Sequence, residues 1–134
     1  MKVAVDTNVL VRYLTWDAEE QAIEAATILE SGDVIVISTI VLCELVWVLK
    51  RAYRYTGAEI VDVVRHLIQT RNIEIDRPAA EVGLQMLARG GDLADGVIRY
   101  DADRAKCDRV VTFDQDFGRP SAPAVKLLGI AQNR

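Results

Sequence analysis

The 134-residue sequence has few of the residues that nucleophilic catalysis and zinc binding depend on. Its two cysteines, Cys43 and Cys107, form neither a disulfide framework nor a zinc-binding spacing. Both lie in apolar helical contexts, so we expect small buried side chains in a reducing cytosol. His66 is the only histidine and has no evident nucleophile, which excludes Ser-His-Asp and Cys-His arrangements. No glycine-rich loop with a lysine is present, so a phosphate-binding loop of that type is also excluded.

The sequence also lacks a membrane-spanning segment, because Glu44 interrupts its longest apolar run. We expect no signal peptide, since Asp6 follows the first residue too closely. Apolar residues make up 51% of the chain and its mean hydropathy is +0.12, which is enough to form a hydrophobic core. This apolar content also suggests that a partner covers part of the surface. The net charge of −4 argues against nucleic-acid binding by a global basic field, although bound cations invert the field of an acidic pocket. We expect one domain, residues 1–134, in a soluble cytoplasmic protein.

Short apolar strands alternate with amphipathic helices along the chain. We expect strands at 2–5, 33–37, 72–75, 109–112 and 124–127, and helices at 7–14, 18–30, about 39–53, 58–70, 78–88 and about 92–106. This alternation predicts an α/β fold with an open, mostly parallel sheet of four to five strands and helices on both faces. Ligands of such sheets bind beyond the carboxyl ends of the strands.

Four widely separated acids stand where these elements start or end: Asp6, Glu44, Asp95 and Asp114. Asp6 closes the first strand and Asp114 follows the fourth, so both fall at the carboxyl edge. Glu44 is the lone charge in an apolar helix, and a carboxylate buried there needs a cation or hydrogen-bond donors. Carboxylates that gather at strand ends without a basic partner indicate a hard-cation site and metal-dependent phosphate chemistry.

Each acid also has a structural explanation. Asp6 can cap the helix that follows it, and Asp92 can do the same for the helix that carries Asp95. Glu44 can pair with an arginine from elsewhere in the fold, and Asp114 can serve a turn. These explanations stay open for any single acid, whereas four acids at converging positions favour a common role.

Three other features have simpler interpretations. The basic and aromatic tract at residues 50–55 can guide a phosphate backbone, but a cationic helix end is the favoured interpretation. Trp16 and Trp47 are expected to pack. His66 is expected to be an ordinary surface or packing residue.

Four segments together resemble the motifs of the PIN-domain family of metal-dependent nucleases, and within it the VapC-type ribonuclease toxins. They are DTNVLVRYL from Asp6, LCELVWVL around Glu44, DLAD followed by Val97-Ile98 around Asp95, and TFDQDF around Asp114. One such match is weak, but all four in order along the whole chain are specific. Two departures from the family occur. Gly96 replaces the usual alanine, which loosens the helix start by roughly 1 kcal/mol, and the same helix is unusually charged at Arg99, Asp101, Asp103 and Arg104.

The resemblance implies an endoribonuclease that depends on Mg²⁺ or Mn²⁺ and hydrolyses RNA phosphodiester bonds. The implied ligands, direct or through water, are Asp6, Glu44, Asp95 and Asp114; the implied supporting residues are Thr7, Asn8, Asp92, Thr112 and Asp116. The resemblance further implies a homodimer and a small antitoxin whose arginine can enter an acidic pocket.

Three rival interpretations were weighed against this one. A non-toxin PIN-type nuclease and a non-catalytic α/β interaction domain with structural acids both remain open. A receiver-like phospho-acceptor domain fails, because it needs paired acids near the first strand and a late lysine. This chain has only Asp6 there, and Lys106 ends a helix rather than a strand.

Overall fold

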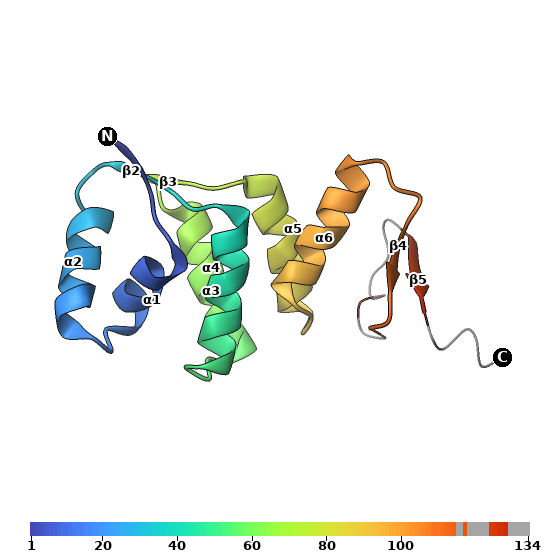
Figure 1. Ribbon diagram of the computed structural model, residues 1–134, viewed down its shortest axis with the longest axis horizontal. Helices are drawn as coiled ribbons and strands as arrows, with labels where there is room; N and C mark the ends of the chain where they lie inside the picture. The colour runs from blue at the N-terminus through green and yellow to red at the C-terminus, as the bar shows by residue number, and fades with distance from the viewer. Residues whose placement is uncertain (115–116, 118–123, 129–134) are drawn as a thin grey trace. The chain divides into compact units, whose positions relative to one another are not determined.

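The computed structural model describes residues 1–114, 117 and 124–128. The chain divides into two compact units, Met1–Ala80 and Glu81–Arg134, with the boundary inside one helix. Helices and parallel strands alternate along the chain (Figure 1). The predicted α/β class with parallel pairing is therefore confirmed.

The first unit contains a three-stranded parallel sheet in the order β1-β2-β3. Its strands are β1 (Lys2–Ala4), β2 (Val34–Val36) and β3 (Ile73–Glu74). Ile35 of β2 stands opposite Val3 on one side and Ile73 on the other, and it is fully buried. The middle strand therefore anchors the sheet to the apolar core of the unit.

Each strand of this sheet leads directly into the N-cap of a helix. Asp6 accepts a hydrogen bond from the Val9 amide at the start of α1 (Thr7–Thr15). Ser38 caps α3 (Thr39–Arg51) in the same way, by accepting from the Val41 amide. The Asp76 carboxylate accepts from the Ala79 amide at the start of α5 (Arg77–Ala88). Because the strands are parallel, all three helix N-termini lie at one edge of the sheet.

Two further helices complete the first unit, α2 (Glu19–Leu29) and α4 (Gly57–Gln69). The pair α3 and α4 lie side by side (Figure 1). Apolar residues at helical spacing form their buried faces: Leu42, Leu45, Val46 and Leu49 on α3, and Ile60, Val64, Leu67 and Ile68 on α4. The helical periodicity of the sequence predicted the face of α4, whereas α3 is apolar on several sides and its buried face comes from the structure.

A polar network ties α1 to the helices that follow it. Arg12 donates from Nε to Gln21 at 2.7 Å and from Nη1 to Asp17 at 3.0 Å. The Tyr53 hydroxyl, just beyond α3, also donates to Asp17. This bond, with smaller contributions from Thr15 and Arg12, lowers the pKa of Asp17. Since the Tyr53 hydroxyl is used in this network, the structure favours the interpretation of residues 50–55 as a cationic helix end.

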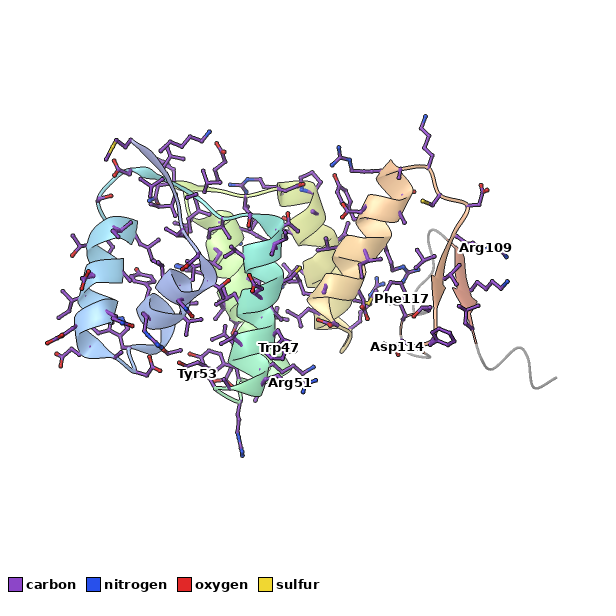
Figure 2. All side chains as sticks on the ribbon, viewed as in Figure 1. Trp47, Arg51, Tyr53, Arg109, Asp114 and Phe117 are labelled. Atoms are coloured by element: carbon purple, nitrogen blue, oxygen red, sulfur yellow. The ribbon has the colours of Figure 1, made fainter. Side chains whose placement is uncertain are left out.

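The packing predictions for Trp16, Trp47 and Cys107 are wrong. Trp16 and Trp47 are 49% and 59% exposed, and Trp47 lies beneath the Arg51 guanidinium at 5.6 Å (Figure 2). Trp16 occupies the left-handed C-cap of α1, which turns it away from the core. Cys107 is exposed because its helix ends before it, and Cys43 is only half-buried.

The second unit contains α6 (Leu93–Arg104) and a parallel pair of strands, β4 (Arg109–Thr112) and β5 (Ala124–Leu127). Asp92 caps α6 as predicted, with its carboxylate accepting from the Ala94 amide. The five predicted strands are thus present, in one sheet of three and one of two. In the part of the chain that the structure describes, no helix is long and apolar enough to cross a membrane.

The capping box of α4 provides a test of this local structure. Thr56 accepts from the Glu59 amide while the Glu59 carboxylate accepts from the Thr56 amide. Because Thr56→Ala removes one of these bonds, we expect it to lower the free energy of unfolding by about 1 kcal/mol in urea denaturation. Thr27→Ala is the control, since its hydroxyl only bonds back to Ile23 within α2. Equal stabilities of the two variants would contradict the capping assignment.

Candidate metal centre

In the first unit, one hydroxyl connects the first two motif segments. The Thr7 side chain donates a hydrogen bond from Oγ1 to Glu44 Oε1 at 3.1 Å. Asp6, the preceding residue, holds the α1 N-terminus through a 3.3 Å bond from the Val9 amide. One oxygen of Asp6 and one of Glu44 are therefore engaged within the protein. The supporting role of Thr7 at a metal site stays a prediction.

Glu44 lies on an exposed part of α3 and is not buried among apolar side chains. The prediction that it needs a cation because of burial is therefore wrong. The buried face of α3 is formed by Leu42, Leu45, Val46 and Leu49, and Glu44 projects from a different side of the helix. A single charge in an apolar run does not reveal whether the helix is covered at that position.

Asn8 is exposed and lines a cavity of about 420 Å³ between α1 and α2. The cavity is also lined by Arg12 and Gln21, which the polar network of α1 already uses. The structure shows no hydrogen bond from Asn8 to Asp6 or Glu44 among the described residues, so its orienting role stays a prediction.

In the second unit, Asp95 lies within electrostatic range of Asp92 and Asp114. Asp95 is half-buried in the first turn of α6 and its pKa is raised from 3.8 to about 6. Burial makes the largest contribution, followed by the negative charges of Asp92 and Asp114. Asp92 and Asp95 are three residues apart on the helix and share a face. This group thus carries unfavourable negative charge that a cation would relieve.

Thr112 holds the backbone beside Asp114. Its hydroxyl oxygen accepts a 3.0 Å hydrogen bond from the Asp114 amide, directly after β4. The Phe117 amide donates to the Asp114 carbonyl at 3.3 Å, and Phe117 is buried (Figure 2). These contacts fix the turn that presents Asp114. The predicted supporting residue Asp116 lies outside the described residues.

Arg99 is a buried cation among the charged residues that the sequence showed to be unusual in α6. It is only 4% exposed, and burial lowers the pKa of its guanidinium. It lies four residues after Asp95, the spacing that puts two side chains on one helical face. The spacing from Asp95 was the signal in the sequence that could have revealed the burial of Arg99. The neighbouring charges of Asp101 and Asp103 obscured that signal.

Each unit therefore presents its own carboxylates. No three acidic, histidine or cysteine side chains among the described residues converge closely enough to hold a metal ion. The oxygen-only donors nevertheless match the ligands that Mg²⁺ and Mn²⁺ prefer. The raised pKa of Asp95 is a second observation that fits a cation.

Comparison with known proteins decides the family. The PIN domain profile matches residues 3–122, which include all four acids. The chain belongs to the PIN domain family. PIN domains are generally metal-dependent nucleases. No curated protein matches this PIN domain closely enough to be compared with it.

The raised pKa of Asp95 gives this PIN domain a pH-dependent stability. The native state holds a proton on Asp95 that the unfolded state releases, so the free energy of unfolding falls as the pH rises from 3.8 to about 6. We expect Asp95→Asn to be more stable than the wild type at pH 7 in EDTA, with little difference at pH 3.5. Urea denaturation at both values measures this difference.

Asp101→Asn, which changes an exposed carboxylate on the same helix, is the matched control and should follow the wild-type pH dependence. If Asp95→Asn also followed the wild-type curve between the two pH values, the electrostatic strain at Asp95 would be disproved.

Proposed function

We propose that this PIN domain is a Mg²⁺- or Mn²⁺-dependent endoribonuclease that hydrolyses RNA phosphodiester bonds in the cytoplasm. The observation that carries the proposal is the family match over residues 3–122, which contains all four motif acids. The raised pKa of Asp95, caused first by burial and then by the charges of Asp92 and Asp114, agrees with it. Structural acids are normally arranged to lower their own energy by capping or pairing, whereas Asp95 is destabilised by its neighbours.

The proposed ligands are Asp6, Glu44, Asp95 and Asp114, directly or through water. Asp6 is the first choice for a direct ligand, because only one of its oxygens is used in capping α1. A bound divalent cation supplies positive charge at the scissile phosphate and lowers the pKa of a water molecule. Mg²⁺ sites of this kind commonly use few carboxylates together with substrate phosphate oxygens.

The protein's own residues would orient the reacting groups. Glu44 positions the attacking water or accepts its proton, and Thr7 holds the Glu44 carboxylate through Oγ1. Thr112 fixes the backbone at Asp114. Neither hydroxyl carries a charge, so both can restrain a carboxylate or its backbone without replacing a cation.

We further propose that the chain is the toxin of a toxin–antitoxin pair and acts as a homodimer. The family membership supports the nuclease, and toxin components are common within it. An antitoxin arginine suits an acidic pocket, because its guanidinium can bind a carboxylate through two hydrogen bonds. With a net charge of −4, the chain is not expected to bind RNA through a global basic field.

The rival function is a non-catalytic interaction domain whose acids only cap helices. Asp6 and Asp92 do cap α1 and α6, which is the observation that favours this rival. The two functions differ in what an isosteric change at Asp6 does, because asparagine caps a helix as well as aspartate.

We expect Asp6→Asn to keep the wild-type melting temperature within a few degrees and to lose divalent-dependent RNA cleavage by at least about 100-fold, in the range seen when a catalytic electrostatic group is removed. Asp76→Asn is the matched control, since Asp76 caps α5 after β3 just as Asp6 caps α1 after β1. The control should cleave RNA like the wild type. Full cleavage by Asp6→Asn would favour the rival function.

A second prediction concerns the cation itself. Because a ligand that binds only the native state stabilises it, millimolar Mn²⁺ or Mg²⁺ should raise the melting temperature of the wild type. At a concentration of about 100 times Kd, the gain in unfolding free energy is about 2.7 kcal/mol. KCl at matched ionic strength is the control for screening. A melting temperature that responds equally to all three salts would argue against the site.

A further inference from the structure

We infer that Gly83 and Gly96 are positioning residues for Asp95, because they allow the backbones of α5 and α6 to touch at the start of α6. The inference rests on the proposed metal-binding role of Asp95. Neither glycine is a motif acid or a hydrogen-bonding partner of one, so the proposed metal ligands do not account for their presence.

The crossing at Gly96 leaves no room for a side chain. A Cβ atom built on Gly96 would lie 2.8 Å from the Gly83 Cα, 2.9 Å from the Val82 carbonyl oxygen and 3.0 Å from the Met86 Cβ. The first two atoms belong to the backbone of α5, so they cannot move aside by a change of rotamer. An alanine at position 96 therefore requires α6 to shift away from α5.

Gly83 makes the reciprocal contact. Its added Cβ would lie 2.9 Å from Leu93 Cγ and 3.2 Å from the Leu93 carbonyl oxygen. Leu93 is the first residue of α6 and is fully buried. Gly83→Ala therefore also displaces the start of α6, but by less, because a side-chain atom accounts for part of the clash.

This contact determines where the carboxylates of α6 lie. Asp95 directly precedes Gly96, and Asp92 caps the same turn three residues earlier. A shift of this turn changes the position of the Asp95 carboxylate relative to the Asp114 carboxylate, whose charge it senses. Misplacement of a catalytic group by about 1 Å can lower a rate by about 100-fold.

The crossing also gives a reason for glycine at position 96. Glycine weakens a helix by roughly 1 kcal/mol relative to alanine, so helix propensity alone favours alanine there. The close contact with Gly83 and Val82 removes that advantage. Gly96 is therefore a requirement of the packing between α5 and α6 in this chain, and its effect is not limited to a looser helix start.

The test compares Gly96→Ala and Gly83→Ala with two controls in the first unit. Gly57→Ala adds a methyl group at the start of α4, where a Cβ meets nothing within 4 Å. Val64→Ala removes core volume from the same helix and lowers stability without touching α6. All variants are made in the full chain, and circular dichroism checks that each is folded.

Two quantities are measured for each folded variant: the rate of Mn²⁺-dependent RNA cleavage, and the Mn²⁺ concentration that half-saturates the rise in melting temperature. We expect Gly96→Ala to need about ten times more Mn²⁺, as when supporting groups around a metal are changed, and to cleave RNA about 100-fold more slowly. Gly83→Ala should show the same changes at smaller size. Both controls should retain wild-type half-saturation, although Val64→Ala melts earlier.

The outcomes separate this inference from the proposed function. If the wild type binds Mn²⁺ but does not cleave RNA, the nuclease proposal fails. The Mn²⁺ concentration at half-saturation then still tests the positioning role of the glycines. If the wild type does not bind Mn²⁺, both fail. If Gly96→Ala does not fold, Gly83→Ala decides. Unchanged half-saturation and cleavage in the folded glycine variants, or an equal loss of Mn²⁺ affinity in Val64→Ala, would overturn the positioning role.

Discussion

The parallel pairing of β1, β2 and β3 is the constraint on which the rest of the first unit depends. Parallel strands end at the same edge, and in this chain each strand passes within two residues into a helix N-cap. The edge therefore collects three helix N-termini and the polar side chains that cap them. Capping explains why polar residues gather at this edge, so capping alone does not distinguish a catalytic acid from a structural one.

Two of the motif acids, Glu44 and Asp95, have interactions that capping does not explain. Thr7 ties Glu44 to the segment that begins with Asp6, so two distant motifs share one hydrogen bond. In the second unit, Asp95 is held where burial and two neighbouring acids oppose its ionisation. A protein tolerates such a cost when function requires it, and the divalent cation that we propose would relieve it.

Local patterns in the sequence predicted most of the fold. Apolar periodicity located the helices, and Asp6 and Asp92 were recognised as possible caps because capping depends on the nearest residues alone. The exposure of Glu44 and Trp47 and the burial of Arg99 were not predicted, since covering a helix face depends on tertiary packing. Gly96 was read as a weak helix start because its close contact with α5 is invisible in the sequence.

The central claim is that the motif acids bind a divalent cation. The most direct test is a crystal structure of the wild type grown with Mn²⁺, with data collected to record the anomalous signal of manganese. The account predicts a manganese peak coordinated by carboxylate oxygens of the proposed ligands. The absence of such a peak in crystals saturated with Mn²⁺, or a peak bound only by other residues, would contradict it.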